Sequence, residues 1–182
     1  IYTGFPTTNF DGVNVEIVRE RCGRYLAKRD KDIEVDVVSG VPDSGTAHAV
    51  GYAMESGKPF RRPLIKYTPG YGRSYTPPSQ ETRDLVAKMK LIPVREIIEG
   101  QRIIVCDDSL VRGTQLKNFT IKKLLQNGAK ETHVRLACPP LMFPCKFIFS
   151  TRSIYELAAR RAVIELEGTE HPDLAPYLDH TT

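Results

Sequence analysis

The sequence predicts an α/β fold in which a mainly parallel, open sheet is flanked by helices. Four short apolar runs, rich in β-branched residues and almost uninterrupted by polar ones, are typical of strands covered on both faces. They occupy residues 35–41, 63–67, 102–107 and 133–139. Helical patterns lie between them, and the alternation of strand and helix favours parallel strands joined by right-handed crossovers.

The helices are predicted from periodicity and end signals. Residues 44–57 are rich in alanine and close on Gly57, which is a suitable C-cap, with Pro59 shortly after it. Residues 13–29 have amphipathic spacing. The residues expected on roughly one side of that helix are Ile17, Cys22, Tyr25 and Leu26.

Two further helices are expected downstream. Residues 114–128 end in Asn127 and Gly128, and residues 154–168 are good helix formers. The apolar residues expected near one face of the first of these helices are Leu116, Ile121, Leu124 and Leu125.

A length of 182 residues suits one domain with a substantial core. We predict an N-terminal helical flank over residues 1–34, an α/β core over 35–150, and a C-terminal helix and tail over 151–182. The chain starts at Ile1 rather than Met and ends on a polar HTT. These ends lead us to expect a fragment or a processed chain.

Composition argues against several classes of protein. The net charge is +4, but basic and acidic residues are interleaved and no basic run of five occurs, so a nucleic-acid interface is disfavoured. No apolar run approaches the ~20 residues that span a bilayer, and no signal-peptide layout opens the chain. The four cysteines lack CxxC spacing, which favours reduced, mostly buried thiols over a disulfide or zinc site. We expect a cytoplasmic protein.

The stretch CDDSLVRGT, residues 106–114, carries the clearest chemical signal. Asp107 and Asp108 fall at the end of a predicted strand, where ligands of open α/β sheets collect. Ionised carboxylates only accept hydrogen bonds, so the vicinal hydroxyls of a ribose are natural partners. The small residues that follow, with Gly113, can turn backbone amides toward a phosphate, and Thr114 can cap the next helix.

Other interpretations of this stretch stay open. It can be only a capped strand–helix junction, or an acidic pair that binds a metal or faces water. Neither the GxxxxGK[ST] nor the GxGxxG spacing is present, which argues against ATPase or dinucleotide chemistry.

Read together, several segments identify a family. VCDDSLVRGT closely resembles the phosphoribosyl pyrophosphate (PRPP) motif of type I phosphoribosyltransferases. With VPDSG, GYAMESGKPF, PPSQETR, REIIEGQR and NGAKETHVRLACPP, the chain resembles the C-terminal phosphoribosyltransferase half of amidophosphoribosyltransferase, the glutamine-dependent enzyme that opens de novo purine synthesis. The resemblance covers roughly residues 11–157 and implies the type I phosphoribosyltransferase fold.

The resemblance also implies roles for individual residues. Asp107 and Asp108 would hold the ribose hydroxyls and, with Ser44 nearby, organise Mg²⁺. The VPDSG loop would face the pyrophosphate, and a lid following Lys66 would contribute the cationic contacts Arg73 and Lys90 beside the catalytic aspartates. The residues expected to bind PRPP are Asp43, Ser44, Gly45, Lys66, Asp107, Asp108, Ser109, Leu110, Val111, Arg112, Gly113, Thr114 and Gln115.

The chain departs from the family pattern at defined positions. Tyr67, Thr68 and Pro69 replace the usual Asn-Arg-Tyr of the lid. Ile92 stands where Asn is usual. Gln115 replaces a second Thr and leaves the phosphate loop one hydroxyl short.

The family's glutaminase domain has no counterpart in this sequence, so we expect free ammonia to be the nucleophile. Cys145 matches one ligand position of an iron–sulfur cluster that some relatives carry, and the other ligands would require a full-length form. We expect a homo-oligomer with no nucleic-acid or membrane partner. Two alternatives remain: a non-catalytic PRPP-binding regulatory module, and a phosphoribosyltransferase acting on a base.

Overall fold

The computed structural model describes residues 4–30, 32–67, 91–144 and 153–178. It divides the chain into two compact units. The first comprises Ile1–Asp108 and Thr114–Ala137, and the second Ser109–Gly113 and Cys138–Thr182. The division into flank, core and tail expected from the sequence stays a prediction.

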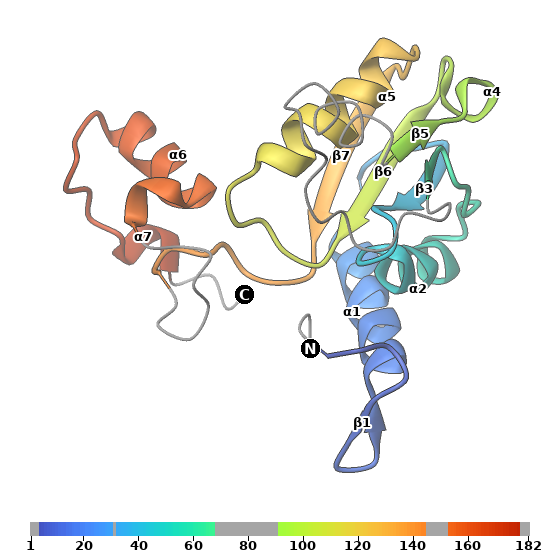
Figure 1. Cartoon of the computed structure of the whole chain (residues 1–182), viewed down its shortest axis with the longest axis horizontal. Helices are drawn as coiled ribbons and strands as arrows, with labels where there is room; N and C mark the ends of the chain where they lie inside the picture. Colours follow the sequence, from blue (N-terminus) through green and yellow to red (C-terminus); the bar gives the residue numbers. More distant parts are fainter. Residues whose placement is uncertain (1–3, 31, 68–90, 145–152, 179–182) are drawn as a thin grey trace, which may run out of the picture. The chain divides into compact units, whose positions relative to one another are not determined.

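The first unit is built on a parallel sheet (Figure 1). Strands β3 (Val37–Gly40), β6 (Arg102–Asp107) and β7 (Glu131–Leu136) pair in the order β3-β6-β7. These three strands confirm three of the four predicted runs, although β7 begins two residues early. The fourth run forms β4 (Leu64–Lys66), which pairs antiparallel with an unpredicted strand, β5 (Leu91–Pro93).

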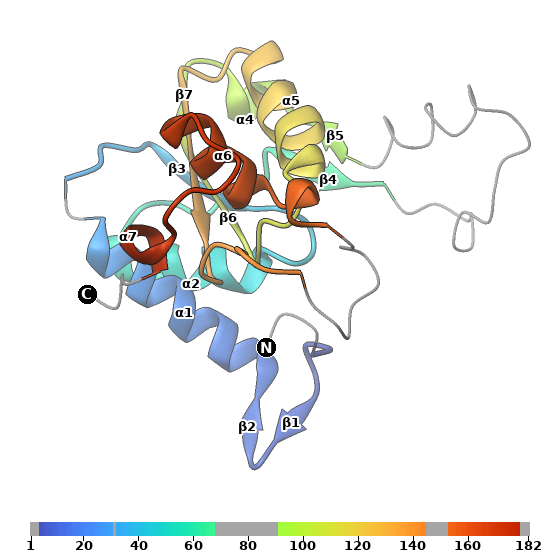
Figure 2. The same ribbon diagram turned by 90° about the vertical axis from the view of Figure 1, so that its left-hand side faces the viewer.

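Alternating side chains give the parallel sheet two buried faces. One face packs on α1 (Val15–Arg29) and α2 (Thr46–Ser56), with Val38 and Ile104 pointing toward these helices. The other packs on α4 (Arg95–Ile98), α5 (Lys122–Gln126) and the β4–β5 pair. Figures 1 and 2 both show the α1–α2 pair and α5 on opposite sides of the sheet.

Helices α1 and α2 meet backbone to backbone through glycine. A Cβ added to Gly23 would lie 1.8 Å from the carbonyl oxygen of His48, and one added to Gly51 would lie 1.9 Å from that of Glu20. Contacts this close exclude any side chain. The two helices can therefore come this close only because Gly23 and Gly51 have a hydrogen atom where other residues have a Cβ.

Leu26 packs against the core and Cys22 is partly buried, but the predicted apolar side of α1 is wrong for its other two residues. Ile17 and Tyr25 are exposed, 46% and 68% respectively. The buried residues of α1 are Val15, Arg19, Gly23 and Ala27. A hydrophobicity pattern cannot detect an interface centred on glycine. The helix also starts two residues later than predicted, because Val13–Asn14 forms β2, which pairs with β1 (Asn9–Phe10) in a hairpin turning at Asp11 and Gly12 (Figure 2).

The helix after residue 113 begins with a wide turn. Thr114 and Gln115 have helical backbone, Leu116–Ile121 is a π-helix, and α5 continues from it. A π turn contains one more residue than an α turn, so it displaces the faces that follow. Leu124 is buried as expected, whereas Leu125 is 52% exposed.

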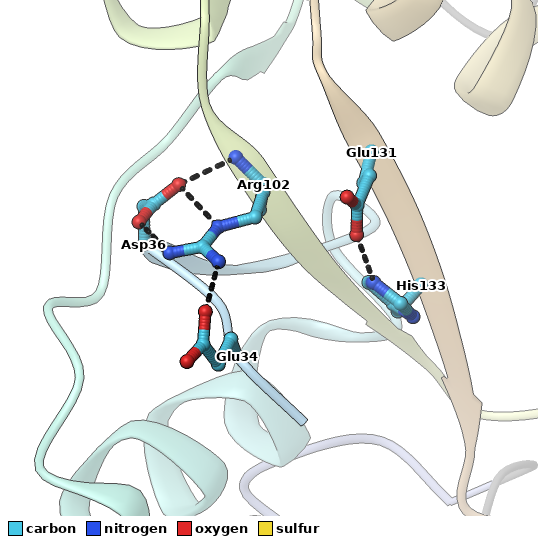
Figure 3. A network of polar contacts seen from close by, with 5 residues as sticks. All are labelled: Glu34, Asp36, Arg102, Glu131 and His133. Carbon is cyan, nitrogen blue, oxygen red and sulfur yellow. Dashed lines mark hydrogen bonds and ion pairs between the residues drawn. The ribbon is translucent and has the colours of Figure 1, made fainter. Parts of the chain in front are cut away.

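An arginine network fixes the sheet at the amino ends of the strands (Figure 3). Arg102 donates from Nη2 to Asp36 Oδ1 at 2.9 Å, and from Nη1 to Glu34 Oε2. Hydrogen bonds from the Arg102 side chain and backbone lower the pKa of Asp36 to about 2. On the neighbouring strand, His133 Nε2 lies 3.2 Å from Glu131 Oε2. Asp36 and Arg102 lie at the end of the sheet opposite Asp107.

The second unit contains short helical elements. They are a 3₁₀ turn, η2 (Ile154–Glu156), and helices α6 (Ala158–Glu167) and α7 (Ala175–Leu178). Helix α6 ends at Glu167 with Gly168 as its C-cap, close to the predicted limit, but it starts four residues later than predicted because Ile154–Glu156 forms the 3₁₀ turn. In the described part of both units, no helix combines the length and apolar character needed to cross a membrane.

The glycine contact generates a test of stability. Gly51→Ala should lower the free energy of unfolding by about 3 kcal/mol, because the new methyl group meets backbone that cannot move independently. Gly100→Ala, at a position with open space but a φ of 72°, should cost only about 1 kcal/mol. Urea unfolding measures both. Equal effects would contradict the close approach of α1 and α2.

Candidate functional site

The loop after β3 is pressed onto the carboxyl end of β6. Val41 N donates to Cys106 O at 2.9 Å, which continues the β3–β6 pairing beyond the strands. A Cβ at Gly45 would lie 2.0 Å from the same Cys106 oxygen. Gly45 N then donates back to Val41 O at 2.8 Å and closes a tight turn that leads into α2. Position 45 must therefore be glycine for the loop to sit against the strand end.

Ser44 and Asp107 join this loop to the acidic pair. Ser44 Oγ donates to Asp107 Oδ1 at 2.7 Å, and the backbone N of Asp108 donates to the same oxygen at 2.9 Å. Among the described residues, no donor contacts Asp107 Oδ2. One carboxylate oxygen thus orients the side chain, and the other remains for a ligand.

The negative charge of Asp107 lowers the stability of the fold. Burial raises its pKa to about 6, and the nearby Asp108 raises it further, although the hydrogen bonds from Ser44 and the Asp108 amide lower it. Its neighbour on β6, Cys106, is fully buried, and burial raises the pKa of that thiol to about 12. The carboxylate is ionised at neutral pH at the expense of stability, which is typical of a group reserved for a ligand.

Lys66, at the end of β4, reaches the same loop. Its Nζ lies 2.6 Å from Asp43 Oδ2, and the two side chains are 42% and 76% exposed. An exposed ion pair of this kind is worth ~0–1 kcal/mol. Lys66 can therefore exchange Asp43 for an anionic ligand at little cost.

The turn Ser109–Gly113 belongs to the second unit, where the helical segment contacts it. Ala158 N donates to Val111 O at 2.8 Å, and Arg161 Nη2 donates to Arg112 O at 2.8 Å. Arg112 Nη2 lies 3.2 Å from Glu156 Oε1. Thr114, expected to cap the following helix, instead has helical backbone itself, and Gly113 precedes it with a φ of 77°.

The predicted site residues fall into three groups. The first unit gathers six of them at the carboxyl ends of β3, β4 and β6: Asp43, Ser44, Gly45, Lys66, Asp107 and Asp108. Thr114 and Gln115 also belong to the first unit, at the start of the helical segment before α5. Ser109–Gly113 lies in the second unit, and Arg73, Lys90 and Cys145 lie outside the described residues. Glu156, Ala158 and Arg161 could not be identified from the sequence, because their contacts join segments more than 40 residues apart.

The oxygen atoms of the site fit Mg²⁺ held together with a phosphorylated ligand. Mg²⁺ takes one or two carboxylates and completes its shell with phosphate oxygens and water. Ser44, Asp107 and Asp108 offer only oxygen ligands of this kind. Within the described ranges, no group of three or more His, Cys, Asp or Glu side chains is arranged to hold a metal alone, so the ligand would have to contribute.

The buried charge leads to a prediction about pH. Asp107→Asn keeps the acceptor oxygen but removes the charge, so at pH 8 it should raise the free energy of unfolding by about 1–3 kcal/mol. Because the folded pKa is raised, wild-type stability falls as pH rises from the ordinary 3.8 through about 6. The advantage of the variant should therefore shrink between pH 6 and pH 4. Urea titrations at several pH values measure it, and a pH-independent difference would contradict the assignment.

Comparisons with known proteins point to one family. The chain is 40% identical over 168 residues to an amidophosphoribosyltransferase of Methanocaldococcus jannaschii, covering 92% of this chain and 35% of that protein. It is 40% identical over 165 residues to the Bacillus subtilis amidophosphoribosyltransferase, covering 91% of this chain and 34% of that protein. The chain thus spans about a third of the length of these curated relatives. No family model matches it.

Solved structures agree with the sequence matches. The glutamine PRPP amidotransferase of B. subtilis, complexed with ADP and GMP, superimposes with a TM-score of 0.75 and 38% identity over 93% of this chain and 37% of that one. A structure described as the allosteric regulatory enzyme of purine biosynthesis gives a TM-score of 0.69 and 42% identity over 79% of this chain and 30% of that one. Over nearly its whole length, the chain is therefore related to one segment of the amidophosphoribosyltransferases and has the type I phosphoribosyltransferase fold that its sequence predicts.

Proposed function

We propose that this chain is the phosphoribosyltransferase part of an amidophosphoribosyltransferase, which binds PRPP with Mg²⁺ and forms 5-phosphoribosylamine and pyrophosphate from ammonia. The observation that carries the proposal is the hydrogen bond of 2.7 Å between Ser44 and Asp107. It joins the loop after β3 to Asp107, the first of two adjacent carboxylates, and a ligand that contains both a pyrophosphate and a ribose requires such a connection. The similarity to named amidophosphoribosyltransferases supports the same reaction.

Each end of PRPP has a matching group in this proposal. Asp107 accepts a ribose hydroxyl through Oδ2, with Asp108 beside it, and Ser109–Gly113 holds the 5-phosphate. The loop that contains Asp43, Ser44 and Gly45 faces the pyrophosphate. Lys66 supports the assignment of this loop to pyrophosphate, because its ion pair with the exposed Asp43 is weak and can be replaced by one with a phosphate oxygen.

The reaction is a displacement at the anomeric carbon. The bond from that carbon to the pyrophosphate oxygen breaks and its electron pair leaves with pyrophosphate. The lone pair of ammonia forms the new C–N bond, and the product ammonium then loses a proton to solvent. When bound, Mg²⁺ would neutralise charge on the departing pyrophosphate. The residues of the chain contribute mainly position and fixed charge.

The electrostatics of the site favour mildly alkaline conditions. Asp107, with a pKa of about 6, is fully ionised only above neutral pH. Ammonia is a nucleophile only when unprotonated, which also requires alkaline pH. Both requirements act in the same direction, so activity should fall as pH decreases from 8 to 6.

A regulatory module that binds PRPP without turnover is the second candidate. It is favoured by Ile92 on β5, an apolar residue 42% exposed to solvent at a position where the resemblance implies Asn. The transferase proposal also includes a glutaminase domain that supplies ammonia, assembly into a homo-oligomer and a cytoplasmic location. A base as acceptor has no support from the described residues.

An assay of pyrophosphate release tests the proposal. The chain is incubated with PRPP, MgCl₂ and an ammonium salt at pH 8, alongside the double variant Asp107→Asn, Asp108→Asn. We expect ammonia-dependent release in the wild type and a loss of at least about 100-fold in the variant, because the ribose is no longer fixed. Asp32→Asn, an exposed carboxylate far along the chain from the acidic pair, is the matched control and should keep full activity.

The possible results separate the candidates. Binding of PRPP by calorimetry without pyrophosphate release would favour the regulatory module. Release that needs no ammonia, or that survives the double substitution, would refute the transferase proposal. Absence of any PRPP binding would reject both candidates.

A further inference from the structure

The turn Ser109–Gly113 is held by a segment to which the sequence assigned no function. Its peptide carbonyls at Val111 and Arg112 both accept hydrogen bonds from the start of α6: Ala158 N to Val111 O at 2.8 Å, and Arg161 Nη2 to Arg112 O at 2.8 Å. All these residues lie within the second unit. The contacts act on the backbone of the turn, so they govern its conformation directly.

The direction of the carbonyls determines the direction of the neighbouring amides. In a trans peptide, the C=O of one residue and the N–H of the next point in opposite directions. The cis bond recorded in the described chain is Pro42–Asp43, so the peptides after Val111 and Arg112 are trans. Because both carbonyls point toward α6, the N–H groups of Arg112 and Gly113 point away from it.

The start of α6 is well fixed. Leu157, the residue before the helix, is 1% exposed, and Arg161 N donates to Leu157 O at 3.0 Å. Gly113 packs on the same helix, since a Cβ added there would lie 3.3 Å from the Cβ of Ala158. Glu156 adds an ion pair with Arg112. The turn is therefore packed and hydrogen-bonded against the start of α6 on one side.

We propose that the start of α6, through Ala158 N and Arg161, is a positioning element that orients the amides of Arg112 and Gly113 toward a bound 5-phosphate. This inference rests on the proposed function, because it concerns the same PRPP site. Ala158 and Arg161 do not touch the ligand. They act through the peptide planes of the turn.

The main test removes one donor without breaking the helix. Ala158→Pro deletes the N–H and places ring atoms against Val111 O. Proline is tolerated at the first position of a helix, and Leu157 has the extended conformation (φ −82°, ψ 122°) that a following proline requires. Ala158→Gly is the matched control, because it keeps the N–H. The probes are ribose 5-phosphate and magnesium pyrophosphate, measured by calorimetry.

We expect Ala158→Pro to weaken binding of ribose 5-phosphate about tenfold or more and to leave that of pyrophosphate within about twofold, since only the first ligand uses the turn. Ala158→Gly should bind both like the wild type. Equal binding of ribose 5-phosphate by the proline variant and the wild type would overturn the inference. A parallel loss for both ligands would also overturn it, because it would indicate a general structural defect.

Arg161 provides an independent test should the proline variant fail to fold. Arg161→Met should weaken ribose 5-phosphate binding about fivefold, and Arg161→Lys, which keeps a donor, should restore most of it. Arg21→Met removes an equal charge at an exposed position of α1 and should have no effect. No effect of Arg161→Met, or no rescue by lysine, would count against the positioning role. If the wild type binds neither probe, the proposed function itself fails, which is a distinct result.

Discussion

The parallel pairing of β3 with β6 is the constraint on which the site depends. Val37–Gly40 and Ile103–Cys106 run side by side in register, and the hydrogen bond from Val41 N to Cys106 O extends the pairing one residue further. The carboxyl ends of the two strands therefore meet at one edge of the sheet. Ser44 reaches Asp107 because of this register, since a shift of one residue would turn the carboxylate toward the opposite face.

The two ends of the sheet use charge differently. At the amino ends, Asp36 is stabilised by Arg102 and its pKa is lowered to about 2. At the carboxyl ends, Asp107 has no cationic partner among the described residues, and burial raises its pKa to about 6. One charge contributes to holding the strands together, whereas the other reduces stability and is retained for chemistry. This is the expected trade-off between a stable framework and a reactive site.

The sequence predicted the elements that follow strong local rules. Strands β3 and β6, helix α2 with its stop at Gly57, and the acidic pair at the end of β6 all follow from apolar runs, glycine signals and motif spacing. Prediction from the sequence failed where tertiary contacts determine which side of a helix is buried. The buried side of α1 is centred on Gly23, which no hydrophobicity pattern marks, and Leu125, expected on the apolar face of its helix, is exposed.

The same distinction applies to the site. The motif residues could be named because each lies beside a strand end or a glycine turn. The pairs Lys66–Asp43 and Arg161–Arg112 could not, since they join segments 23 and 49 residues apart. Residue spacing within one segment is readable from sequence, but the meeting of two segments requires the packed chain.

The reactivity of Cys106 reports on local unfolding of the central strand. The thiol is fully buried in the central strand and burial raises its pKa to about 12, so in the folded state it neither ionises at neutral pH nor meets an alkylating reagent. Cys22 and Cys138 are only partly buried. Alkylation of Cys106 therefore requires that β6 leave the sheet, and its rate would follow the fraction of molecules in which the ligand-binding edge no longer exists.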